Sequence, residues 1–215
     1  LKIFDVKPKK FDPDLSLLLL TSGSTGDPKS VRISHTNLTS ATENIVNYLK
    51  LSNGSTSLAL LPFHYSYGLS VLNNAIYTRS SILLTQKDVL DKTLWDDCIK
   101  NQITDISAVP FILELMVRMN LPEDFYKYLQ CMTQAGGRLN PKITQRFIEI
   151  SNKHSFKYFT MYGQTEASPR ISYVPPDRGI EKLGSVGRPI DCGEVYIDTI
   201  NNKTGEGELI YTGAN

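Results

Sequence analysis

The stretch Thr21-Ser22-Gly23-Ser24-Thr25-Gly26-Asp27-Pro28-Lys29-Ser30, which directly follows the apolar run 15–20, is the part of the chain that decides its fold. Glycines let the backbone turn several N–H groups toward one anion, hydroxyl groups add donors, and Lys29 adds a positive charge. The pattern G-x-x-x-x-G-K-[ST] is not met, because Pro28 stands where its second glycine would be, and G-x-G-x-x-G is absent as well. The alternative is a Ser/Gly-rich surface turn. We therefore predict a phosphate-binding loop of a different kind.

Five further segments carry the same indication, in chain order. They are PFHYSYGLS (62–70), QAGGRLNP (134–141), MYGQTEAS (161–168), GSVGRPI (184–190) and GEGELIYTG (205–213). Together with the first stretch they resemble the adenylate-forming superfamily, which contains acyl-CoA synthetases, luciferases and the adenylation domains of nonribosomal peptide synthetases. Arg138 departs from the family pattern, where Glu or Ala is more usual. Six ordered matches across nearly the whole chain make coincidence an unattractive explanation.

The resemblance implies a nucleotide site for ATP and Mg²⁺. The residues expected to bind the nucleotide are Thr21, Ser22, Gly23, Ser24, Thr25, Gly26, Lys29, Gly136, Gly137, Arg138, Tyr162, Gly163, Gln164 and Thr165. Within this set the 21–26 loop and Lys29 would hold the β- and γ-phosphates, the glycine pair would line the adenine site, and Tyr162 would stack on adenine. Thr165 would hydrogen-bond the α-phosphate, and Glu166 would bind the metal, since Mg²⁺ accepts few protein carboxylates together with phosphate oxygens.

The implied reaction is attack by a carboxylate on the α-phosphorus of ATP, with release of pyrophosphate. An ordinary carboxylic acid is already ionised at pH 7, so this nucleophile needs no general base. Positioning and charge neutralisation remain, and Lys29 and Thr165 are the residues expected to supply them. His64 would steer the carboxylate between the nucleotide and acyl sites without acting as an obligate acid or base. The alternatives are a packed histidine at position 64 and an exposed loop acid at Glu166.

The segment Phe63-His64-Tyr65-Ser66 bears on the substrate. Amino-acid-activating relatives carry an aspartate in F-D-x-S, whose charge pairs with the substrate ammonium, and a neutral histidine supplies no such charge. We expect a carboxylic acid without an α-amino group, followed by thioester formation with coenzyme A or a carrier-protein pantetheine. Two alternatives stay open: an amino-acid adenylation domain of a peptide synthetase, and a non-catalytic nucleotide-binding module.

Short apolar runs alternate with amphipathic segments, which predicts an α/β fold with a largely parallel sheet flanked by helices. Strands are expected at 15–20, 31–34, 57–61, 81–85, 106–109, 131–134 and 158–161. Apolar residues at helical spacing predict helices over 38–49, 111–119 and 143–150, the last after an Asn140-Pro141 start. Beyond Pro175-Pro176, Gly-punctuated runs at 195–200 and 208–211 predict a small β-rich lobe. We expect a core from 1 to 174 and this subdomain from 175 to 215.

Composition describes a globular chain and excludes some classes of function. The chain has 215 residues, 40% of them hydrophobic, and a formal net charge of +1, which gives no support for a nucleic-acid partner. Its three cysteines, Cys98, Cys131 and Cys192, have no C-x-x-C spacing, so neither a disulfide framework nor a zinc site is indicated, and a cytoplasmic location is expected. The apolar run 15–20 is much shorter than the roughly 20 residues of a membrane span.

Some parts of the family pattern are missing from this sequence. Ala214 stands where a ribose-binding aspartate of Y-x-T-G-D would follow Gly213, so 205–213 is interpreted as an earlier structural element. The ribose aspartate, a hinge and the catalytic lysine of a mobile C-terminal domain are expected outside this chain. We therefore expect an incomplete part of a ligase that turns over poorly on its own.

Overall fold

The structure is a computed structural model that describes residues 10–21, 29–119, 121–201 and 203–215. Its strands are β1 Leu15–Thr21, β2 Lys29–Ser34, β3 Thr56–Ala59, β4 Ser81–Leu84, β5 Asp105–Ala108, β6 Cys131–Gln134, β7 Lys157–Tyr162, β8 Ser172–Tyr173, β9 Arg188–Pro189, β10 Gly193–Asp198 and β11 Glu208–Gly213. Its helices are α1 His35–Leu49, α2 Ser66–Thr78, α3 Lys92–Lys100, α4 Pro110–Met119 and α5 Pro141–His154, with 3₁₀ turns η1 Glu123–Lys127, η2 Thr165–Ala167 and η3 Pro176–Arg178.

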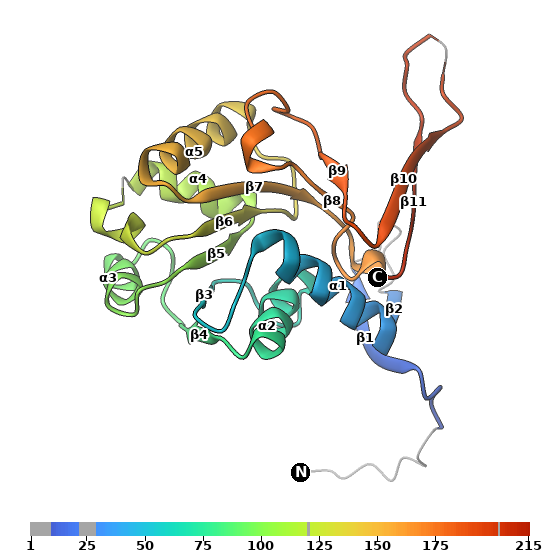
Figure 1. The fold of residues 1–215 in the computed structure, drawn as a ribbon, viewed down its shortest axis with the longest axis horizontal. Coiled ribbons are helices and arrows are strands. Elements are labelled where there is room, and N and C mark those ends of the chain that lie inside the picture. Colours follow the sequence, from blue (N-terminus) through green and yellow to red (C-terminus); the bar gives the residue numbers. More distant parts are fainter. Residues whose placement is uncertain (1–9, 22–28, 120, 202) are drawn as a thin grey trace.

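A seven-stranded sheet in the order β4-β3-β5-β6-β7-β8-β9 forms the centre of the molecule. The pairs from β4 through β7 are parallel, and β8 and β9 add an antiparallel edge. Helices α1 and α2 pack on each other on one side of this sheet, and α4 and α5 pack on each other on the other side (Figure 1). The predicted α/β fold with a largely parallel sheet is confirmed.

Two antiparallel hairpins stand apart from the central sheet. β1 pairs with β2, and β10 pairs with β11. The runs 15–20 and 31–34 are therefore strands, as expected, but they belong to a sheet of their own. The second hairpin projects away from the helices and central sheet (Figure 1), and it confirms the small β pair expected near the end of the chain.

Local signals in the sequence account for the helix starts. Ser34 accepts a hydrogen bond from the Asn37 backbone N–H at 3.0 Å, and the Asn37 side chain accepts one from the Ser34 N–H, also at 3.0 Å, which caps α1 from both sides. Asn140 caps α5 by accepting from the Lys142 N–H at 2.9 Å, with Pro141 in the first turn. This confirms the start that was predicted for α5.

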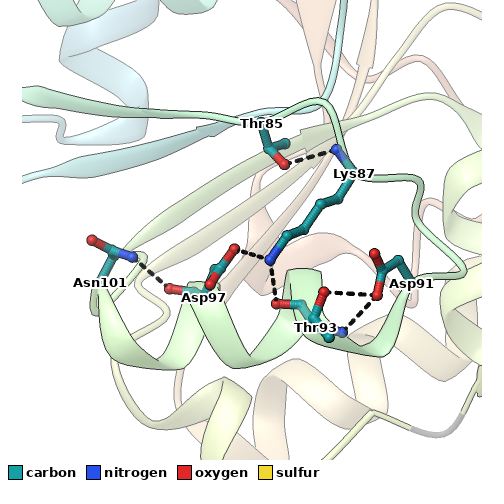
Figure 2. A network of polar contacts seen from close by, with 6 residues as sticks. All are labelled: Thr85, Lys87, Asp91, Thr93, Asp97 and Asn101. Carbon is teal, nitrogen blue, oxygen red and sulfur yellow. Dashed lines mark hydrogen bonds and ion pairs between the residues drawn. The ribbon is translucent and has the colours of Figure 1, made fainter.

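Helix α3 begins at a similar cap and is tied to the preceding loop (Figure 2). The Asp91 carboxylate accepts hydrogen bonds from the backbone N–H and the hydroxyl of Thr93, at 2.9 and 2.8 Å. Those bonds lower the pKa of Asp91 below its ordinary value. Lys87 forms an ion pair with Asp97 and donates to the Thr93 carbonyl at 3.3 Å. This loop therefore fixes where the crossover from β4 to β5 begins.

The core lies between the sheet and its helices, and in one helix it uses a different face from the one the spacing predicts. In α4 the buried residues are Ile112, Leu113 and Met116, whereas Phe111 is 67% exposed. The expectation that Phe111 is core was wrong. The reason is that α4 is apolar on nearly all sides, so periodicity alone does not select the face that the sheet covers.

No helix among residues 10–21, 29–119, 121–201 and 203–215 is long and apolar enough to cross a membrane. The three thiols are free, and Cys98 and Cys131 are buried. Burial raises the pKa of Cys98 to about 12. That thiol is therefore protonated near neutral pH and is a poor nucleophile.

Candidate active site

The carboxyl ends of four neighbouring strands deliver the candidate site. Leu61 to Ser66 follow β3, Val109 follows β5, Gly136 to Leu139 follow β6, and Gly163 to Thr165 follow β7. Because β3, β5, β6 and β7 are parallel and adjacent, their ends meet at one edge of the sheet. Open α/β sheets bind ligands outside this edge.

The larger cavity at this edge, here called cavity A, has a volume of about 610 Å³. It is lined by Tyr65, Gln134, Gly136, Gly137, Arg138, Leu139, Thr144, Thr160, Met161, Tyr162, Gly163, Gly184, Ser185 and Val186. Its size lies within the roughly 300–1,000 Å³ typical of small-molecule sites. Five residues expected to bind nucleotide therefore share one cavity: Gly136, Gly137, Arg138, Tyr162 and Gly163.

A second cavity of about 540 Å³, here called cavity B, is lined by Leu19, Leu20, Leu61, Pro62, His64, Tyr65, Ser66, Val109 and Thr165. It contains His64 and Thr165, and its wall is mainly apolar. His64 itself is exposed. Tyr65 lines both cavities, so its side chain lies between them.

Gly136 and Tyr65 are in close contact. Gly136 has a φ of +81°, which favours glycine, and a Cβ placed there would lie 2.6 Å from the Tyr65 hydroxyl oxygen. The turn after β6 is also held from within, because the Gln134 side-chain amide donates to the Gly137 carbonyl at 2.8 Å. The glycine pair therefore lets Tyr65 lie directly over the backbone at the end of β6.

The turn η2 carries Thr165 and Glu166. Thr165 Oγ1 lies 3.2 Å from the hydroxyl of Ser66, in the first turn of α2, while Glu166 is exposed and Gln164 precedes the turn. The chain can fold this tightly after β7 because a Cβ on Gly163 would lie 1.7 Å from the Pro169 carbonyl oxygen. Glu166 and Gln164 line neither cavity.

The phosphate-binding loop lies largely outside the described residues, which leave out Ser22, Gly23, Ser24, Thr25 and Gly26. The residues on either side of it are described: Thr21 ends β1, and Lys29 begins β2 directly opposite, with its side chain exposed. β2 packs against η2, and Leu19 and Leu20 of β1 line cavity B. The first hairpin therefore brings both ends of the loop to the same edge of the sheet as Thr165.

A buried cation lies beneath η2. Arg170 is 1% exposed, and its guanidinium carbon lies 4.9 Å from the centroid of the Tyr67 ring. Tyr67 in turn shares a hydrogen bond of 2.6 Å with Thr133. Burial raises the pKa of Tyr67, and the positive charge of Arg170 opposes that rise. The floor under the 165–170 turn is therefore a set of packed, protonated side chains that carry one positive charge.

The family model described as AMP-binding enzyme matches residues 4–215. The chain belongs to the AMP-binding enzyme family. It is 32% identical over 193 residues to the probable CoA ligase CCL9 of Humulus lupulus, a match that covers 87% of this chain and 36% of the relative.

Solved structures of similar fold carry the ligands of this chemistry. o-Succinylbenzoate CoA synthetase (MenE) from Bacillus subtilis, in complex with the acyl-adenylate intermediate OSB-AMP, matches with a TM-score of 0.77 and 26% identity over 92% of this chain and 40% of MenE. MenE has also been solved with ATP and magnesium ion. VinN in complex with L-aspartate matches with a TM-score of 0.76 and 26% identity over 97% of this chain and 52% of VinN. The chain thus spans less than half the length of CCL9 and of MenE.

Sequence reasoning missed three residues of the site. Tyr65 separates the two cavities, Ser66 contacts Thr165, and Val109 lies beside Gly136 and lines cavity B. Tyr65 and Ser66 were inside a recognised segment, but attention went to His64 because histidine is the titratable residue there. The position of Val109 directly after a strand was the only signal for it.

Proposed function

We propose that the protein containing this chain activates a carboxylic acid as an acyl-adenylate, with release of pyrophosphate, and then transfers the acyl group to the thiol of coenzyme A. The observation that carries the proposal is the convergence of the recognised segments after β3, β6 and β7 on two cavities that share Tyr65. The family and the ligands of MenE support it. A cytoplasmic location is part of the same proposal.

In this proposal cavity A takes the adenosine and cavity B takes the acid. Gly136, Gly137 and Arg138 would face the adenine, and Tyr162 would stack on it. Cavity B has an apolar wall suited to an acyl group, and Thr165 lines it on the side of η2. Tyr65, between the cavities, would guide the carboxylate to the α-phosphate, a task that we assigned to His64 from the sequence. His64 remains a candidate at the outer wall.

The chemistry asks little of the protein beyond placement and charge. The acid is ionised at neutral pH and attacks without a base, and the charge that develops on the phosphates needs stabilising donors. Lys29 and the 21–26 loop would hold the β- and γ-phosphates, and the Thr165 hydroxyl would donate to the α-phosphate. Glu166 fits a Mg²⁺ ligand, since it is an exposed carboxylate beside Thr165 and Mg²⁺ takes its other ligands from phosphate and water. Bound Mg²⁺ would neutralise charge on the pyrophosphate as it leaves.

A second candidate is activation of an amino acid, which the match to VinN with bound L-aspartate favours. The lining of cavity B argues against it, because none of the described residues in that lining is acidic. A substrate ammonium there would lack a counter-charge. A non-catalytic nucleotide-binding module is the third candidate.

Carboxylate-dependent exchange of pyrophosphate into ATP separates these candidates. The full-length parent protein would be assayed with fatty, aromatic, dicarboxylic and amino acids, with Glu166→Gln as the variant. We expect exchange with an acid that lacks an α-amino group, and loss of that exchange in the variant. Exchange with amino acids alone would establish the second candidate. ATP binding without exchange for any acid would establish the non-catalytic module.

A further inference from the structure

The end of the second hairpin is attached to the turn that carries Thr165 and Glu166. Asn215 is 7% exposed, and its side-chain Nδ2 donates to the carbonyl oxygens of Ala167 and Arg170, each at 2.6 Å. Ala167 is the last residue of η2. Figure 1 shows this end of the chain beside the short turn that follows β7. One amide therefore holds both sides of the 167–170 bend.

The Asn215 amide is itself held in one orientation. Its Oδ1 accepts hydrogen bonds from the Tyr211 hydroxyl and, at 3.3 Å, from the Cys192 thiol. Burial raises the pKa of Tyr211 to about 12, so its hydroxyl keeps its proton and remains a donor. These two donors place the carbonyl of the amide toward the hairpin and its NH₂ group toward η2. An amide is the group that can accept on one side and donate twice on the other.

The backbone around Asn215 is anchored to α1. Asn37 donates through Nδ2 to the Ala214 carbonyl at 3.0 Å, and Asn44 accepts from the Cys192 N–H at 3.1 Å. Asn37 is also part of the N-terminal cap of α1. The end of the hairpin is thus fixed against a rigid helix, and it cannot move freely with η2.

We propose that Asn215 is a positioning residue for the metal and α-phosphate site, holding η2 so that Thr165 and Glu166 face the nucleotide. This rests on the proposed function. Asn215 lines neither cavity, so it acts through the backbone of the turn. Residues that orient a metal ligand without touching the metal have effects on affinity that approach those of the ligand itself.

The test is the gain in ATP affinity that Mg²⁺ provides, measured by isothermal titration of the full-length parent with ATP in the presence and absence of Mg²⁺. Asn215→Asp keeps the size of the side chain but points acceptors at two carbonyl oxygens. We expect the Mg²⁺-dependent gain to fall about tenfold. Asn152→Asp, the same change on the exposed face of α5, should leave the gain unchanged. A ratio of affinities within one variant does not depend on how much of it is folded, so a merely structural role would not move it.

Two further variants keep the outcome decisive. Glu166→Gln reports on the proposed metal role itself: if it changes the gain and Asn215→Asp does not, the inference on Asn215 is overturned while the proposed function stands. If neither changes the gain, the metal role of Glu166 fails and the inference fails with it. Should Asn215→Asp not fold, Tyr211→Phe takes its place, because it removes one of the donors that orient the amide. A smaller loss of the gain is expected, and an unchanged gain overturns the inference.

Discussion

The Tyr65 hydroxyl lies against the backbone of Gly136, at the 2.6 Å that would separate it from a Cβ on that glycine. This contact joins the end of β6 to the segment after β3, and it forms the boundary between cavity A and cavity B. The boundary therefore depends on a residue with no side chain on one side and a phenol on the other.

Replacing Gly136 with alanine tests that contact. The left-handed backbone costs an alanine roughly 1–2 kcal/mol, and the new methyl group also displaces Tyr65. Gly184→Ala is the matched control, because Gly184 has a φ of +82° with nothing within 4 Å of the added Cβ. We expect both variants to lose stability in thermal melts, and Gly136→Ala alone to raise the KM values for ATP and the acid. Tyr65→Phe should restore part of the loss in the double variant, and no restoration would place the effect elsewhere.

Truncating Tyr65 to alanine should join the two cavities. Because the acid would lose one wall, we expect its KM to rise about tenfold, equivalent to about 1.4 kcal/mol of binding, with a smaller change for ATP. Steady-state kinetics over a series of acids would measure this, and larger acids should lose least. His64→Ala is the comparison variant. A larger effect of His64→Ala than of Tyr65→Ala on the KM of the acid would return the steering role to His64.

Asp105 gives the stability of the fold a pH dependence. It is 7% exposed and accepts hydrogen bonds from Ser57 and Thr104, yet burial dominates and raises its pKa above the ordinary 3.8. The folded state then binds the proton more tightly than the unfolded chain, so stability falls as pH rises from near 4 through the raised pKa. Asp105→Asn should flatten this fall in melting temperature, whereas Asp96→Asn, on an exposed face of α3, should leave it unchanged. An equally steep fall in Asp105→Asn would mean that another group causes it.

The cap of α1 should contribute to stability independently of the site. Ser34→Ala removes the acceptor for the Asn37 N–H, which costs about 1 kcal/mol. Thr39→Ala, at an exposed position within the same helix, removes a hydroxyl without a cap and should have little effect. Urea unfolding of both variants gives the comparison. Equal effects of the two changes would show that the cap contributes nothing measurable.

Sequence reasoning found the long elements and missed the short or unmarked ones. Cys131–Gln134 was predicted with its observed bounds, since a buried strand between turn residues is a strong local pattern. The two-residue strands β8 and β9 exist only through pairing with neighbours, so no local pattern announces them. The division at residues 174 and 175 stays a prediction. β9 lies beyond that boundary and pairs with β8 in the central sheet.

The candidate site shows the same limit. Glycines and hydroxyl residues at fixed spacings identified the segments, because few other residue types hold a nucleotide at such close range. The contacts between segments were out of reach: the pairing of Ser66 with Thr165 joins residues that are 99 positions apart in the chain. Asn215 was likewise unremarkable in the sequence, and only the fold brings it to η2.

The order of the strands across the sheet, β3-β5-β6-β7, also determines how much of the chain must exist before the site does. No contiguous piece shorter than the run from Leu61 to Thr165 contains the four strand ends that form the two cavities. During synthesis, nucleotide binding would thus begin only after β7 has emerged and paired. A chain cut between α4 and β6 would divide the cavities into two incomplete halves, and ATP would then act as the clasp that favours their reassembly.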